Sequence, residues 1–138
     1  MNRQEKESAV NSLKAQFETS PFVVFVDYRK VTVAEIDHVR RSCEAKELQY
    51  LVAKNTFVRK AVENTDKEII SEAEFLKGMT GIIFSGEDAI AGAKFVRELV
   101  KDFSKKEKFT VKGGFFDGEL LDTKGVDQVA DFLSRDDL

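Results

Sequence analysis

The sequence contains very little cysteine, histidine, proline and tryptophan, and each scarcity excludes a class of structure or chemistry. Cys43 is the only cysteine and His38 the only histidine among 138 residues. An intrachain disulfide or a metal site of several cysteines is therefore excluded, and a catalytic histidine has no recognisable Ser or Asp partner. With one proline and no low-complexity tract, no linker divides the chain. We expect one domain over residues 1–138, with no cofactor and no enzymatic activity.

Long apolar runs are also missing, and the chain has no overall surplus of positive charge. No segment is long enough to span a bilayer and no signal peptide is apparent, so we expect a cytoplasmic protein with no membrane partner. Apolar residues make up 42% and charged residues 34%, which is typical of a globular domain. The net charge of −3 argues against a surface coated in positive charge, but it allows a local basic patch.

Hydrophobic periodicity divides the chain into helices and strands. Short apolar runs predict strands, and apolar residues at helical spacing predict helices. Thr32 with Glu35, and Ser85 with Asp88, have the spacing of helix-capping pairs. An Asp117-Gly118 turn between apolar pairs predicts a hairpin. The expected strands cover residues 22–26, 49–53, 80–84 and 108–112, and the expected helices cover residues 3–19, 32–46, 55–64, 85–103 and 126–133.

The order of these elements predicts an α+β fold. Without the first and third helices, the order is strand, helix, strand, strand, helix, strand, which is the ferredoxin-like split βαβ pattern. We expect a four-stranded, mostly antiparallel sheet with two helices on one face. The extra N-terminal helix and the helix inserted after the second strand would cover other surfaces.

The first candidate site is the junction where the second strand passes into its following helix. Lys54, Arg59 and Lys60 lie there with no acid among them, and Asn55 or Thr56 can cap the helix. Free N–H groups at a helix start attract phosphate, and adjacent cations strengthen that attraction. The alternative interpretation is a solvated helix face.

Two further groups of cations have less specific patterns. Tyr28, Arg29 and Lys30 follow the first strand, where an aromatic ring can stack on a base while the cations neutralise phosphates. The alternative there is an ordinary polar loop. The third group shares one face of the fourth expected helix, and we expect a solvated, salt-bridged face. Its members are Lys94, Arg97, Lys101 and Lys105.

Four segments carry a resemblance to a known family. They are residues 23–29 with 31–33, residues 52–61, residues 78–85 and residues 111–118. In order along the chain, they resemble the bacterial large-subunit ribosomal stalk-base family, protein L-ten, whose archaeal and eukaryotic relatives are called P-zero. The resemblance covers essentially the whole chain, and residues 52–61 are its most specific part.

The resemblance implies a structural, non-enzymatic protein of the large ribosomal subunit. The family's N-terminal domain binds large-subunit (23S) rRNA beside protein L-eleven and anchors the stalk that recruits translation factors. Lys30 departs from the family, which often has glycine at this position. The residues that we expect to contact rRNA are Tyr28, Arg29, Lys30, Lys54, Asn55, Thr56, Arg59 and Lys60.

The remaining expectations concern the C-terminal end of the chain and two alternative functions. The family continues past a segment like residues 134–138 into a helix that carries dimers of the acidic stalk protein, and this helix is absent here. The chain is thus either a piece of a longer protein or one that cannot carry those dimers. A small regulatory domain that binds a metabolite or a partner protein is the alternative function. A third candidate function is an acyl- or phosphoryl-transfer enzyme. Arg29 and Asn55 could form its anion cradle, but the sequence shows no evident base.

Overall fold

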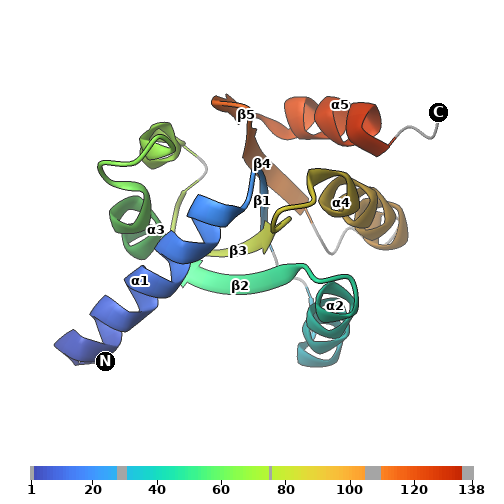
Figure 1. Cartoon of the computed structure of the whole chain (residues 1–138). Helices are drawn as coiled ribbons and strands as arrows, with labels where there is room; N and C mark the ends of the chain where they lie inside the picture. Colours follow the sequence, from blue (N-terminus) through green and yellow to red (C-terminus); the bar gives the residue numbers. More distant parts are fainter. Residues whose placement is uncertain (1, 28–30, 75, 105–109, 135–138) are drawn as a thin grey trace.

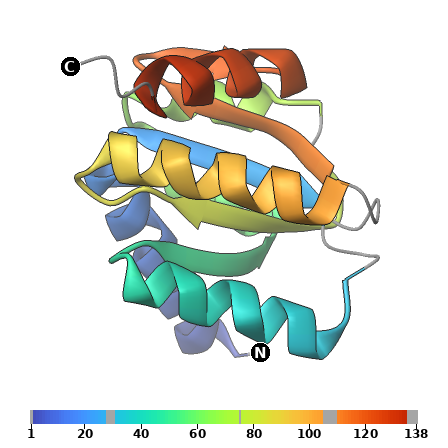
Figure 2. The same cartoon turned by 90° about the vertical axis from the view of Figure 1, so that its right-hand side faces the viewer.

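Helices cover both faces of a single sheet (Figures 1 and 2). The structure is a computed structural model, and it describes residues 2–27, 31–74, 76–104 and 110–134. Its strands are β1 (Phe22–Asp27), β2 (Gln49–Lys54), β3 (Met79–Phe84), β4 (Thr110–Phe116) and β5 (Glu119–Leu121). Its helices are α1 (Arg3–Thr19), α2 (Val33–Ala45), α3 (Asn55–Val62), the 3-10 helix η1 (Glu68–Glu72), α4 (Ala89–Ser104) and α5 (Thr123–Ser134).

The strand order confirms the ferredoxin-like topology. The strands pair in the order β2-β3-β1-β4-β5, and every neighbouring pair is antiparallel. The prediction of four strands is one short, because β5 extends the sheet beyond β4. The predicted hairpin creates this strand: Asp117 and Gly118 have φ values of 51° and 79°, the two positive values that a type I′ turn requires.

The sheet separates two apolar cores. Residues 22–26 are all buried, and successive side chains point to opposite faces, as in a strand covered on both sides. Val24 and Val26 pack with residues of α2, α4 and α5, whereas Val23 and Phe25 pack with residues of α1, α3 and η1. The first face was predicted to carry two helices. It carries three, because Val126 and Ala130 bury α5 there as well.

The predicted helix starts are correct for α2 and wrong for α4. Thr32 and Glu35 form the capping box of α2, with each side chain accepting the other residue's backbone N–H. At α4 the Asp88 carboxylate accepts the N–H of Ala91 at 3.1 Å, and the helix begins at Ala89 instead of residue 85. Ser85 is buried, and its hydroxyl accepts the N–H of Phe22 at 3.3 Å. Its contact with β1 therefore keeps Ser85 at the end of the sheet.

Candidate nucleic-acid interface

The predicted basic junction lies where β2 ends and α3 begins. Lys54 occupies the N-cap position and its side chain makes no capping hydrogen bond, so the N-cap lies one residue before the predicted Asn55. The Asn55 N–H donates to the carbonyl of Gly78 at 2.9 Å. The Thr56 N–H donates to Asn55 Oδ1 at 2.8 Å. Because these two N–H groups are occupied, side-chain charge is the stronger attraction for a phosphate at this junction.

Asn55 and Arg59 are turned toward η1 and the segment that follows it. The Arg59 guanidinium is half-buried and donates from Nε to the Ser71 carbonyl at 3.1 Å and from Nη2 to the Leu76 carbonyl at 3.2 Å. Asn55 Nδ2 donates to the same Leu76 carbonyl at 3.2 Å. Hydrogen bonds to a charged group are stronger than neutral ones. These bonds therefore tie α3 to the chain that returns to β3, and they fix the position of the junction.

Lys54, Thr56 and Lys60 are turned toward solvent. All three are exposed, and neither lysine has an ion-pair partner in the described part of the chain. Thr56 and Lys60 lie one helical turn apart on α3, and they line the same hollow beside α1. The predicted residues on α3 thus divide into two sets. One set is bound internally, and the other is available to a ligand.

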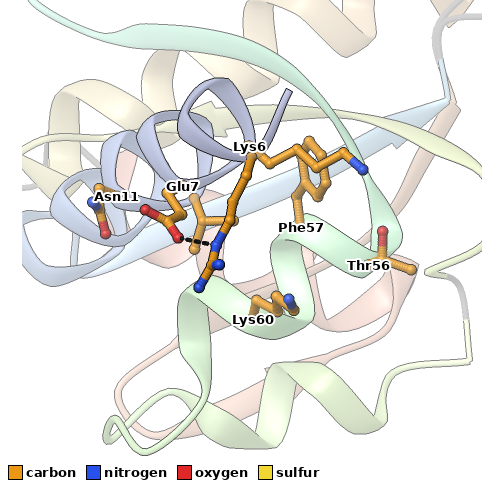
Figure 3. A pocket seen from close by; sticks show the side chains of 8 residues that line it. Lys6, Glu7, Asn11, Thr56, Phe57 and Lys60 are labelled. Carbon is orange, nitrogen blue, oxygen red and sulfur yellow. Dashed lines mark hydrogen bonds and ion pairs between the residues drawn. The ribbon is translucent and has the colours of Figure 1, made fainter. Parts of the chain in front are cut away.

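The hollow between α1 and α3 has a volume of about 620 Å³ and mixes apolar and cationic groups (Figure 3). Val10 and Phe57 supply its half-buried apolar surface. Glu7 is its only acid, and Glu7 accepts a hydrogen bond from Arg3 Nε at 3.2 Å, the dashed line of Figure 3. The lining residues are Arg3, Lys6, Glu7, Val10 and Asn11 from α1, and Thr56, Phe57 and Lys60 from α3.

Arg3 and Lys6 did not emerge from the sequence as site residues. Their spacing with Val10 is helical, so the sequence shows that one face of the first helix carries them. It contains no signal that this face meets α3, because the two helices are more than thirty residues apart along the chain. The packing of α1 beside α3 brings the cations of both helices to one hollow.

The other predicted cations have different outcomes. Tyr28, Arg29 and Lys30 lie outside the described residues, as does Lys105. On α4, Arg97 donates to Asp131 of α5 at 2.8 Å, which confirms a salt-bridged face at that position. Glu98 on the same helix pairs with Lys46 at 2.8 Å.

The chain's single cysteine is buried and its single histidine is exposed. Cys43 is fully buried, and burial raises the pKa of its thiol from 9.0 to about 12, so the reactive thiolate is disfavoured. His38 is exposed. Among the described residues, no three His, Cys, Asp or Glu side chains are grouped to hold a metal ion. None of the described helices has both the length and the apolar content to cross a membrane.

Comparison with known proteins gives consistent matches. The family model of ribosomal protein L10 matches residues 1–101. The large ribosomal subunit protein uL10 of Burkholderia cenocepacia (strain HI2424) is 37% identical over 141 residues, which cover 100% of this chain and 80% of that protein. The uL10 protein of Bifidobacterium animalis subsp. lactis (strain AD011) is 39% identical over 139 residues, which cover 100% of this chain and 76% of that protein. The uL10 protein of Delftia acidovorans (strain DSM 14801 / SPH-1) is 34% identical over a match that covers 99% of this chain and 74% of that protein.

Proposed function

The chain belongs to the ribosomal protein L10 family, and on that premise we propose that it binds large-subunit rRNA through the exposed cations of α1 and α3. By this contact it would anchor the base of the ribosomal stalk, to which translation factors are recruited. As a family member it is a structural protein of the large ribosomal subunit, not an enzyme, and it works on the ribosome in the cytoplasm.

The observation that carries the proposal is a set of exposed lysines in a chain whose net charge is −3. Lys6, Lys54 and Lys60 have no ion-pair partner among the described residues, and they lie on α1, at the end of β2 and on α3. A lysine that is not paired within the protein can neutralise a phosphate without first losing an internal partner. The hydroxyl of Thr56 adds a hydrogen-bonding group for phosphate or ribose.

Asn55 and Arg59 stabilise the position of this interface through hydrogen bonds within the protein. Their bonds to the carbonyl groups of Ser71 and Leu76 hold α3 against the rest of the fold, so that Lys60 and Thr56 keep a fixed position. A fixed donor position lowers the entropic cost of binding. In this proposal, these two residues position the contacting side chains.

Tyr28, Arg29 and Lys30 are proposed to extend the interface. Asp27, which precedes them, is the last residue of β1. Because β1 and β2 are both antiparallel to β3, they run parallel to each other, and Asp27 lies at the same end of the sheet as Lys54. β1 therefore ends beside the basic junction, and the ring and two cations that come next in the sequence suit RNA.

The remaining partners follow from the family and are also proposals. Residues 1–138 would act as one rRNA-binding domain beside protein L-eleven. Dimers of the acidic stalk protein would bind through the family's C-terminal helix.

A salt titration of rRNA binding tests the proposal. The probe is a transcript of the 23S rRNA segment at the stalk base, and affinity is measured by filter binding between 50 and 200 mM salt. Each neutralised phosphate contributes about 0.7 to 0.9 to the log–log slope. Replacement of Lys6, Lys54 and Lys60 by Ala should therefore reduce the slope by roughly 2 to 3 and weaken binding at every salt concentration.

The matched control is a triple variant on the other face of the sheet, with Arg41, Lys46 and Arg97 replaced by Ala. It removes the same total charge, but its residues are already paired with Asp37, Glu98 and Asp131. Its slope should stay close to that of the unaltered protein. Equal losses in both variants would show a general charge effect and would overturn the proposed interface.

A further inference from the structure

The hollow between α1 and α3 has the three chemical features of a nucleotide site. Phe57 gives it an aromatic ring, Lys6 and Lys60 give it two cations without ion-pair partners in the described ranges, and Asn11 and Thr56 give it short hydrogen-bonding groups. Figure 3 shows these side chains around one space, with Lys6 and Asn11 from α1 and the others from α3. An interface that contacted only the phosphates of a duplex would need the cations alone.

We propose that this hollow receives one unpaired nucleotide of the bound RNA. Its base stacks on Phe57, and the phosphates on either side of it lie against Lys6 and Lys60. This inference rests on the proposed rRNA binding and adds the kind of RNA element that is recognised. A bulge, loop or single-stranded end can present the face of a base, whereas the bases of a continuous duplex are stacked on each other.

The volume of the hollow and the packing of Phe57 favour an unpaired nucleotide as the ligand. Its volume of about 620 Å³ is within the range of sites that enclose small organic ligands, about 300 to 1,000 Å³. Phe57 is half-buried, and its neighbours Val58 and Ala61 are fully buried in the core beneath α3. The ring is therefore held by a packed helix while part of it remains accessible. A ring held in this way loses little conformational entropy when a base stacks on it.

The charges of the hollow favour an anionic ligand over a neutral apolar one. Arg3, Lys6 and Lys60 oppose Glu7 alone, and the Glu7 carboxylate is already hydrogen-bonded to Arg3. A neutral apolar side chain would leave these cations without counterions. A nucleotide satisfies both the aromatic surface and the cations, because its base is a planar ring and its phosphates are anionic.

Because the chain has no tryptophan, a Phe57→Trp variant carries a single fluorescent reporter in the hollow. The probes are a stem with one bulged nucleotide, the same stem fully paired, and adenosine monophosphate. We expect stacking to quench the fluorescence with the bulged stem at a concentration at which the paired stem and the mononucleotide have little effect. The matched control is Phe132→Trp, which places the reporter at an exposed position of α5 and should show no quenching.

Affinity provides a second measurement in case the new tryptophan alters the hollow. Phe57→Leu keeps an apolar side chain but removes the aromatic face, so the bulged stem should bind roughly tenfold more weakly and the paired stem should be unaffected. Equal quenching by paired and bulged stems, or equal affinities of Phe57→Leu and the unaltered protein for the bulged stem, would overturn the inference. Quenching by the mononucleotide at the same concentration would overturn it in favour of a site for free nucleotides.

Failure of this inference can be separated from failure of the proposed function. If the protein binds the rRNA transcript with a slope that depends on Lys6, Lys54 and Lys60, but Phe57 has no role, the interface contacts phosphates only. If the unaltered protein does not bind the transcript at all, the proposed function itself is wrong.

Discussion

The cations on the two faces of the sheet lie in different surroundings. On the face of α2, α4 and α5, several cations are engaged within the protein: Lys46 pairs with Glu98, and Arg97 pairs with Asp131. On the face of α1, α3 and η1, Lys6 and Lys60 border a hollow and have no partner in the described ranges. Both faces have apolar cores beneath these charges. The two faces therefore differ in whether these cations are paired within the protein.

The largest effect that we expect comes from removing the aromatic anchor of α1. Phe17 is 2% exposed and meets the ring of Phe84 edge to face at 5.0 Å. Phe17→Ala should lower the free energy of unfolding by about 3 to 5 kcal/mol. It should also weaken rRNA binding by the folded protein, because α1 would no longer hold Arg3 and Lys6 beside α3. Urea denaturation and filter binding measure the two effects.

The control for Phe17→Ala is Phe22→Ala on the opposite face. Phe22 is 1% exposed, and its ring meets that of Phe116 at 6.0 Å. This variant should be destabilised to a similar degree, yet its folded form should bind rRNA normally. Equal losses of affinity in the two variants would remove the distinction between the faces.

Arg59 should affect stability more than RNA binding. Arg59→Ala removes the hydrogen bonds to Ser71 and Leu76, and we expect a loss of about 1 to 3 kcal/mol in the free energy of unfolding. The segment of residues 63–78 should also become more sensitive to limited proteolysis. Lys60→Ala, at the next position, should stay within about 0.5 kcal/mol of the unaltered protein. If Arg59→Ala instead keeps its stability and loses as much RNA affinity as Lys60→Ala, Arg59 contacts RNA directly.

Cys43 should make the core under α2 sensitive to alkaline pH. Because burial raises the pKa of the folded thiol from 9.0 to about 12, the unfolded chain loses this proton at a lower pH than the folded protein. The contribution to stability is fully present below pH 9 and is lost as the pH rises toward 12, with a slope of up to about 1.4 kcal/mol per pH unit. In Cys43→Ala this part of the slope should disappear from urea denaturation measured between pH 8 and 10. An unchanged slope would contradict the assignment to Cys43.

The smallest effect should come from the Arg97–Asp131 pair. Both side chains are nearly half exposed, at 48% and 45%, so solvent screens their attraction. Arg97→Ala should cost at most about 1 kcal/mol, and less at high salt. Its rRNA affinity should be unchanged. A fall in affinity comparable to that of Lys60→Ala would show that the face of α4 also binds RNA.

Much of the fold could be predicted from the sequence because its signals are local. The capping box of Thr32 and Glu35 and the turn at Asp117-Gly118 involve residues within a few positions of each other, and both are present. The predicted start of α4 is wrong because it depends on a contact between residues far apart in the sequence. Ser85 has the right spacing for a cap, but the N–H group of Phe22, sixty-three positions away in the sequence, donates to its hydroxyl.

The candidate site was predicted less completely than the fold. Lys54, Thr56 and Lys60 were identified and are exposed. Arg59 was identified as well, but its guanidinium is bound to carbonyl groups of a segment whose proximity the sequence does not reveal. Lys6 was missed because its importance depends on which helix lies beside α1. A hydrogen-bond partner or a neighbouring helix that is distant in sequence leaves no periodic pattern.

The sequence by itself determined the five α-helices, four of the strands and the presence of a cationic segment in an acidic chain. These properties follow from the order and spacing of side chains along one segment. The tertiary structure alone decided which cations are paired within the protein, which remain available, and that α1 and α3 together enclose a hollow. Those outcomes depend on contacts between segments far apart in the chain, and the geometry of packing selects such contacts only when the whole chain has folded.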